Sequence, residues 1–434
     1  MNGLYYTLQK KIDQISKIKV SSFLSLFGLL KIGFYLRHRI RKWKLSKGII
    51  FNNQPTHPDI EEFIESDNYI QLNLIILTPH GRSGSWFFQS LFDAHEEIVS
   101  FPAMYRYDFP EIISNWKTTL LDQCAYHPSF FDTSKGTLSK VGRNVTSAII
   151  DEKGTQPKVD TSKFISYAAN FFSLISKSQS KTISRKNFII GTHIALHKSL
   201  GFDISKLKYI LIHFHNYSET LSYNHYQALD DFPDLFYFAL VRDPREHWLA
   251  NQKKLKILYG SAYRDHSEKL MQIFMYKLKT YVKHLLEFAR HIEPDRLIIL
   301  DLNKLHKANR AAMTYFSKKL NLTYSDSLTI STFLGCTWKG NSSDYKEISG
   351  FDPRKAILQW PSQLLPEDIE HINSNCLDEL TALRYPISAY LTSASDKGIY
   401  KSREDHKAKL ACDYQSGLNL SSFFQGAEIY RDRS

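Results

Sequence analysis

Residues 74–92, LIILTPHGRSGSWFFQSLF, combine a strand pattern, a glycine turn and a helix pattern in an order that suits binding of a phosphate group. The first residues form an uncharged run of the kind found in strands that are buried on both faces. Gly81 and Gly84 allow a tight turn, and Arg82 adds a fixed positive charge. A helix that begins near Ser85 would point its free N–H groups at an anion. The segment therefore predicts a phosphate-binding loop between a strand and a helix.

The glycine spacing excludes two common nucleotide-binding loops. A nucleoside triphosphatase loop reads GxxxxGK[ST], whereas only two residues separate Gly81 from Gly84 and no lysine follows the second glycine. The dinucleotide fingerprint GxGxxG is also absent. An ordinary strand-to-helix turn, with Ser83 or Ser85 as the helix cap, remains the alternative interpretation.

A second segment, FYFALVRDPREHWLANQ at residues 236–252, has the same organisation. Its apolar strand pattern ends at Arg242, and a helix pattern begins after Pro244. In α/β proteins, ligands bind at the carboxyl edge of a parallel sheet, so two arginine-bearing strand ends there would form one site. Two such strand ends indicate a ligand with two anionic groups.

The pair of segments resembles the sulfotransferases that use 3′-phosphoadenosine 5′-phosphosulfate (PAPS), and the resemblance looks closest to bacterial and carbohydrate members. It covers residues 72–386, because three later segments follow in the family's order: residues 296–305, 316–322 and 332–343. The resemblance implies an α/β fold of the P-loop-like three-layer type, with a central, mostly parallel sheet between helices and with helical insertions. It makes PAPS the expected co-substrate.

The resemblance assigns the 5′-phosphosulfate to the first segment. Arg82 would contact the oxygen that bridges phosphate and sulfate, and the remaining contacts would come from Ser83, Gly84, Ser85 and Trp86. Backbone N–H groups supply most of these contacts, together with the Ser85 hydroxyl. Trp86 stands where the family usually has a second hydroxyl group, so one hydrogen bond to the phosphate is missing or is supplied elsewhere.

The same resemblance assigns the 3′-phosphate to the second segment. Arg242 takes the position of the family's 3′-phosphate arginine, but the serine expected eight residues later is Ala250, for which Asn251 could substitute. A late loop contributes three further candidates: Trp338 as an adenine stack, and Lys339 and Gly340 as 3′-phosphate contacts. The alternative for Trp338 is a buried side chain that fills the core.

Sulfuryl transfer requires an in-line nucleophile, a base for its proton and positive charge at the departing phosphate. Arg82 and the helix N-terminus suit the last role. For the base, Thr192-His193 resembles a family element that carries a catalytic histidine, and residues 188–191 suggest a preceding strand. Glu111 is the second candidate, because carbohydrate sulfotransferases tend to use a glutamate after the first loop.

Two further histidines, His213 and His215, would share one face of a strand end, because side chains alternate with a period of two. They are candidates for substrate binding, and buried, hydrogen-bonded histidines are the alternative. No HxH-plus-carboxylate or CxxC pattern indicates a metal site, so none is expected.

The net charge of +12 is concentrated at the N-terminus. Residues 1–50 hold eleven Lys or Arg and one acidic residue, Asp13, which gives this segment a charge of +10. The remaining 384 residues therefore carry only +2. This nearly neutral body argues against nucleic acid as a partner. The apolar run at residues 20–36 is short for a membrane span, so a basic amphipathic helix on an anionic membrane surface is expected. A helix packed on the folded body is the alternative. Four scattered cysteines suit a reducing compartment and a cytoplasmic protein.

The chain divides into the basic arm at residues 1–50, a sulfotransferase-like domain at residues 70–390 and a polar tail at residues 391–434. Residues 105–186 look like an insertion that would select the acceptor. Residues 267–292 predict a long helix, and residues 360–383 a final helix with Pro366 near its start.

The sequence thus predicts transfer of a sulfuryl group from PAPS to a hydroxyl of a carbohydrate or glycolipid near a membrane. A P-loop kinase or nucleotide hydrolase, and a catalytically silent nucleotide-binding scaffold at a membrane, remain alternatives.

Overall fold

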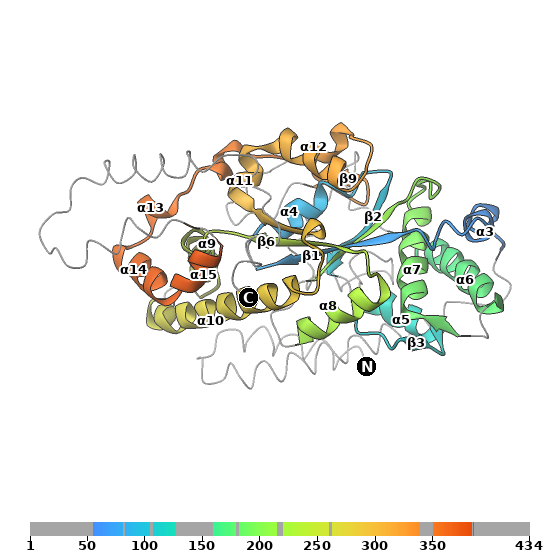
Figure 1. The fold of residues 1–434 in the computed structure, drawn as a ribbon, viewed down its shortest axis with the longest axis horizontal. Helices are drawn as coiled ribbons and strands as arrows, with labels where there is room; N and C mark the ends of the chain where they lie inside the picture. The colour runs from blue at the N-terminus through green and yellow to red at the C-terminus, as the bar shows by residue number, and fades with distance from the viewer. Residues whose placement is uncertain are drawn as a thin grey trace, which may run out of the picture.

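The protein is a three-layer α/β structure built on a five-stranded parallel sheet (Figure 1). The computed structural model describes residues 55–80, 83–104, 107–126, 159–178, 182–214, 220–259, 263–338, 350–383 and 385. In spatial order the strands are β2 (Ile98–Met104), β5 (Tyr209–His213), β1 (Asn73–Pro79), β6 (Phe236–Val241) and β7 (Leu297–Asp301). This confirms the predicted P-loop-like α/β fold.

The strands are buried because helices cover both faces of the sheet. Leu74, Ile75, Ile76 and Leu77 in β1 are fully buried, as the uncharged run predicted. In Figure 1, α4 (Ser85–Ser90), α11 (Leu302–Lys307) and α12 (Asn309–Lys319) lie above the sheet. Below it lie α8 (Thr220–Asp231) and α10 (Tyr263–Ala289).

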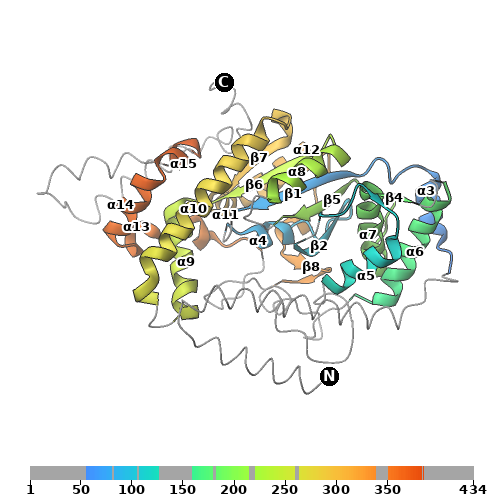
Figure 2. The same cartoon turned by 90° about the horizontal axis from the view of Figure 1, so that it is seen from below.

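The helices α3, α5, α6 and α7 gather at the β2 end of the sheet, and α9 and α13–α15 lie at the opposite end of the molecule (Figures 1 and 2). Their bounds are α3 Pro58–Glu65, α5 Trp116–Tyr126, α6 Thr161–Ser178, α7 Arg185–Ser199, α9 Pro244–Tyr259, α13 Trp360–Gln363, α14 Pro366–Asn375 and α15 Leu377–Ala382. Two short antiparallel pairs complete the described strands: β3 (Ile112–Ile113) with β4 (Ile183–Ser184), and β8 (Thr332–Phe333) with β9 (Cys336–Thr337).

The strand order places a topological switch point at β1. The chain leaves β1 toward β2 on one side and returns through β5, then crosses to β6 and β7 on the other side. Ligands of open α/β sheets bind outside the carboxyl ends of the strands at such a point. The loop after β1 therefore occupies the position where this topology forms a binding crevice.

The prediction of a strand before His193 is wrong. Residues 185–199 form α7, and twelve of its residues, from Arg185 and Asn187 to His197, are buried. A helix buried on all sides has no polar stripe to show a helical period. Its apolar stretch FII therefore resembles a short buried strand in the sequence.

Other predicted helices are present, with different bounds. The long helix expected at residues 267–292 is α10, and it spans 27 residues. The final helix expected at residues 360–383 is divided into α13, α14 and α15. Pro366 begins α14, and Glu367 and Asp368 lie in its first turn, as predicted.

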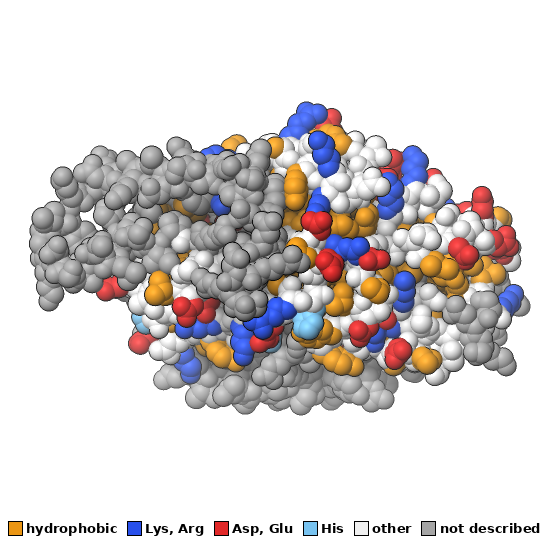
Figure 3. Space-filling model, in the orientation of Figure 1, with side chains coloured by type: hydrophobic (Ala, Val, Ile, Leu, Met, Phe, Trp, Pro, Cys, Tyr) orange, Lys and Arg blue, Asp and Glu red, His pale blue; other side chains and the backbone are white. Residues whose placement is uncertain are grey.

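The folded body includes residues before 70, because Ile60 and Phe63 of α3 belong to the core. The basic arm and the polar tail fall outside the described residues. Within the described ranges, the helices include none that is long and apolar enough to cross a membrane. Acidic and basic side chains are interspersed over the described part of the face in Figure 3, in keeping with the small net charge outside the arm.

Candidate functional site

The chain enters α4 from the loop after β1 through Ser83 and Gly84. Gly84 is the N-cap of α4 and has φ +79°, a left-handed conformation that favours glycine. Neither Gly81 nor Arg82 is among the described residues, whereas Ser83 is fully buried, and its Oγ has no hydrogen-bond partner among the residues that the structure describes. Ser83 therefore does not cap α4. The N–H groups of the first turn have no partners within the helix, so they and the Ser83 hydroxyl can bind an anion.

Gly84 also fixes the loop against the end of β7. A Cβ atom at this position would lie 2.4 Å from Cδ1 of Leu302, the first residue of α11. A side chain at residue 84 would therefore need both an unfavourable φ and displacement of Leu302. The close approach brings the β1 loop and the β7 end together at one edge of the sheet.

Arg242 lies at the same edge, as the sequence predicted. Strand β6 pairs directly with β1, and Pro79 is opposite Leu240, two residues before Arg242. The Arg242 guanidinium donates a hydrogen bond from Nη2 to Oε1 of Glu246, at 3.2 Å. Both side chains are largely buried, with exposed fractions of 12% and 4%. The predicted cationic strand end is therefore present, and it is paired with a carboxylate of the following helix.

The second arginine of the VRDPR segment has a structural role. Arg245 is fully buried, and its Nη2 donates to Oδ2 of Asp243 at 2.6 Å. Its Nε donates to Oδ1 of the same carboxylate, and its guanidinium lies over the Trp360 ring, 4.2 Å from the centroid. Arg245 is thus enclosed and held by two hydrogen bonds to one carboxylate, whereas 12% of the Arg242 side chain is exposed, so Arg242 is the arginine of this segment that suits a ligand.

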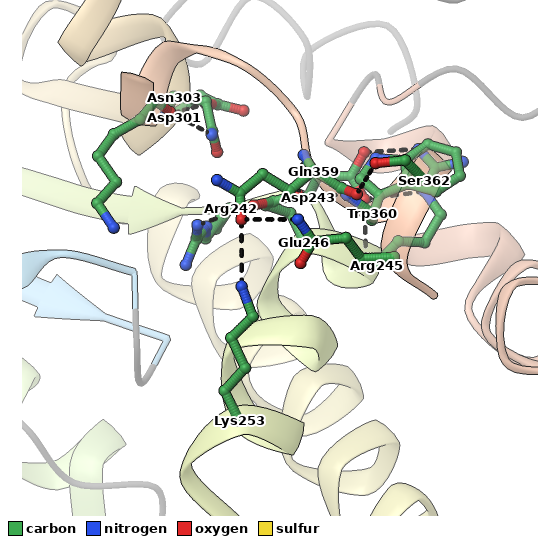
Figure 4. Close-up of polar contacts among 12 residues, drawn as sticks. Arg242, Asp243, Arg245, Glu246, Lys253, Asp301, Asn303, Gln359, Trp360 and Ser362 are labelled. Atoms are coloured by element: carbon green, nitrogen blue, oxygen red, sulfur yellow. Dashed lines mark hydrogen bonds and ion pairs between the residues drawn. The ribbon is translucent and has the colours of Figure 1, made fainter. Parts of the chain in front are cut away.

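Glu246 joins Arg242 to the C-terminal helices, a contact that the sequence did not predict. Its Oε2 accepts hydrogen bonds from the backbone N–H groups of Gln359 and Trp360, at 2.8 and 2.9 Å (Figure 4). The Gln359 side chain in turn accepts a hydrogen bond from Nζ of Lys253, at 3.2 Å. Residues 242–253 and 359–360 therefore form one polar network, although more than 100 residues separate them in the chain.

Trp86 and His213 lie beside the phosphate loop and pack against each other. Their ring centroids are 4.9 Å apart in an edge-to-face arrangement. His213 ends β5, is fully buried, and bonds through Nδ1 to Oε1 of Gln89 at 3.1 Å. Trp86 is partly buried and also contacts Phe333. The structure thus brings His213 next to the loop, and His215 falls outside the described residues.

His193 lies within the core, where it is poorly placed for a base. Its side chain is fully buried in α7, its Nδ1 bonds to the carbonyl oxygen of Ile189 at 2.7 Å, and its ring packs on Phe101. Burial lowers the pKa of His193 to about 3, which favours the neutral imidazole. A general base must reach the acceptor's proton, and this arrangement does not provide that access.

Glu111 is exposed, in the segment just before β3, and its carbonyl oxygen accepts the N–H of Arg185 at 2.8 Å. Asn251 is partly buried on α9. Trp338 is buried, with 2% of its surface exposed, and packs on Phe333. This position matches the core-filling alternative, whereas an adenine stack needs an accessible ring face. The candidates Lys339 and Gly340 fall outside the described residues.

His80 is a neighbour of the loop that the sequence interpretation missed. It follows β1 directly, is 3% exposed and lies 4.2 Å from His247 between ring centroids. Burial, together with the charge of Lys277, lowers the pKa of His80 to about 3. The only signal in the sequence was its position immediately before the glycine turn. Within the described residues, no three His, Cys, Asp or Glu side chains converge as metal ligands.

No protein-family model matches the chain, and no curated protein matches it in sequence. Several solved structures are similar to it. A sulfotransferase domain from the curacin biosynthetic pathway is 15% identical with a TM-score of 0.40, over 73% of this chain and 99% of that one. A sulfotransferase domain of the Synechococcus PCC 7002 olefin synthase is 15% identical with a TM-score of 0.39, over 73% and 96%. A sulfotransferase from Mycobacterium avium is 10% identical with a TM-score of 0.34, over 76% and 82%.

Proposed function

We propose that the protein is a sulfotransferase that moves a sulfuryl group from PAPS to a hydroxyl of a carbohydrate or glycolipid. One observation carries the proposal: two adjacent parallel strands, β1 and β6, both end in anion-binding groups at the switch point of the sheet. The β1 end offers the first turn of α4 and the Ser83 hydroxyl, and the β6 end offers Arg242. PAPS carries anionic groups at both its 5′ and its 3′ positions, which suits two such ends.

The residues of the β1 loop suit the 5′-phosphosulfate. The Ser83 Oγ is buried and finds no partner within the described ranges, and such a hydroxyl costs stability unless a ligand satisfies it. The α4 N-terminus adds N–H donors aligned with the positive end of the helix dipole. Arg82 completes the proposed set of ligands together with Ser85 and Trp86, and its charge would stabilise the charge that gathers on the departing phosphate.

In the proposed reaction, the acceptor oxygen attacks sulfur in line with the bond between sulfur and the bridging oxygen. The S–O bond to the phosphate breaks as the new O–S bond forms, and adenosine 3′,5′-bisphosphate (PAP) leaves. A general base removes the acceptor's proton. We choose Glu111 over His193 as the base because the Glu111 side chain is exposed, whereas that of His193 is fully buried.

The base assignment has a direct test. Glu111→Gln should lower kcat by about 100-fold or more and leave the affinity for PAP unchanged, because the amide cannot accept the proton. His213→Asn provides the comparison, since the His213 ring packs edge-to-face with Trp86 beside the loop. Loss of turnover in His213→Asn alone would move the assignment to His213.

The acceptor class and the site of action complete the proposal. We place the protein at the cytoplasmic face of an anionic membrane, with the basic arm at residues 1–50 as its contact and a glycolipid or carbohydrate as acceptor. Removing residues 1–47 should reduce sedimentation with phosphatidylserine vesicles and preserve the affinity for PAP. Equal sedimentation of the shortened protein would refute the membrane contact.

A transfer assay with radiolabelled PAPS tests the function itself. The protein should pass label to at least one member of a carbohydrate and glycolipid panel, and Arg242→Ala should transfer much more slowly. PAP binding without transfer to any acceptor would favour a silent nucleotide-binding scaffold. Tight, magnesium-dependent ATP binding without PAP binding would favour a kinase or hydrolase.

A further inference from the structure

Helix α9 carries Glu246, Ala250 and Lys253 along one side. These residues are four and three positions apart, the spacing that places side chains on the same face of a helix. Ala250 lies in the middle of this line and has no polar group. Lys253 is partly buried, and Figure 4 shows it extending from α9 toward Gln359. Lys253 therefore places a cation one turn after Ala250, on the side of α9 that also carries Glu246, the partner of Arg242.

The charges around Arg242 leave little attraction for a phosphate unless a second cation takes part. Arg242 and Glu246 form a largely buried ion pair, so their charges cancel at short range. Asp243 and Arg245 cancel in the same way, at 2.6 Å. A phosphate monoester carries close to two negative charges at neutral pH. Lys253 adds the charge that makes this network net positive.

The position of Lys253 is fixed by the network that holds Arg242. Its Nζ donates to the side-chain oxygen of Gln359 at 3.2 Å, and the Gln359 N–H donates to Glu246 at 2.8 Å. Glu246 accepts from Arg242 through its other oxygen at 3.2 Å. Gln359 thus holds the lysine on the side where Arg242 lies, and one of the three N–H donors of the ammonium group is used there.

We propose that Lys253 is the second cationic ligand of the 3′-phosphate, in the place of the hydroxyl that Ala250 lacks. This assignment rests on the proposed function, because it concerns the 3′ end of the same nucleotide. Lys253 contributes charge and a hydrogen bond to the phosphate, and Gln359 is its positioning residue.

The test compares two nucleotides that differ only at the 3′ position, PAP and 5′-AMP, by calorimetry. Lys253→Ala should weaken PAP binding by about tenfold or more, the effect of losing one charged hydrogen bond, and should leave 5′-AMP binding unchanged. Lys256→Ala is the matched control: Lys256 is exposed on the same helix, and it lies over the Tyr263 ring instead of the network. It should bind both nucleotides like the unmodified protein.

A rescue variant separates ligand binding from packing. Ala250→Ser in the Lys253→Ala background should recover part of the PAP affinity, because the hydroxyl lies one turn from the lost ammonium group. Equal PAP affinity of Lys253→Ala and the unmodified protein would overturn the assignment. So would a parallel loss of 5′-AMP affinity, since that would mean a packing role. If the unmodified protein binds no PAP, the proposed function itself fails. That outcome differs from failure of the Lys253 assignment alone, in which the unmodified protein still binds PAP.

Discussion

His193 should behave as a buried neutral histidine, with a stability effect that depends strongly on pH. In the unfolded chain its pKa is near the ordinary value of 6.5, and burial lowers its pKa in the folded protein to about 3. Between these values the unfolded chain binds a proton that the folded protein excludes. Stability from this group is therefore present above about pH 6.5 and is lost as the pH falls toward 3.

The size of the effect follows from the two pKa values. At pH 5 the unfolded chain gains about 2 kcal/mol by protonating His193, and at pH 7 it gains only a few tenths. His193→Leu keeps an apolar side chain of similar size against Phe101 and removes the titrating group. Relative to the unmodified protein, the variant should therefore gain about 2 kcal/mol when the pH is lowered from 7 to 5.

Urea unfolding of both proteins at pH 5, 7 and 8 measures this difference, and the values at pH 7 and 8 should agree within a few tenths of a kcal/mol. The same free-energy difference at pH 5 and pH 7 would refute the buried position of His193. The folded variant should also transfer the sulfuryl group as fast as the unmodified protein in the assay that tests the proposed function. Loss of turnover with unchanged stability would restore His193 as the base.

Two further predictions concern the elements around the loop. Gly84→Ala should lower the free energy of unfolding by about 1–3 kcal/mol, measured with urea. In the Gly84→Ala/Leu302→Ala double variant the shortened side chain at residue 302 should relieve the steric part of this loss. If the losses of the two single variants simply add, the close contact is contradicted. Burial raises the pKa of Asp93 to about 6, so stability from this group is present below pH 4 and is lost as the pH rises through 6. Asp93→Asn should remove this pH-dependent part of the free energy of unfolding, which is roughly 3 kcal/mol. The same pH dependence of unfolding in the variant and the unmodified protein would contradict the prediction.

Local patterns predicted the strands and helices that carry the candidate site. The uncharged run indicates strand β1, and Pro244 indicates the start of α9, because each signal depends only on residues close to it in the chain. The same holds for Pro366 in α14. Proline favours the first helical turn, because it needs no N–H partner there and its φ is already helical.

The errors came from features that depend on distant parts of the chain. Helix α7 is buried on all sides, so its sequence has no amphipathic period, and His193 was placed at a strand end instead. The VRDPR pattern contains two arginines, and the sequence does not show that Arg245 is the one buried between Asp243 and Trp360. The Glu246–Gln359 contact spans 113 residues, and no local pattern encodes it.

Calorimetry tests most directly whether this chain binds a nucleotide with anionic groups at both ends. The unmodified protein should bind PAP without magnesium and more tightly than 5′-AMP, and Arg242→Ala should bring the two affinities close together. Equal affinity of the unmodified protein for PAP and 5′-AMP, or no binding of PAP, would contradict the account.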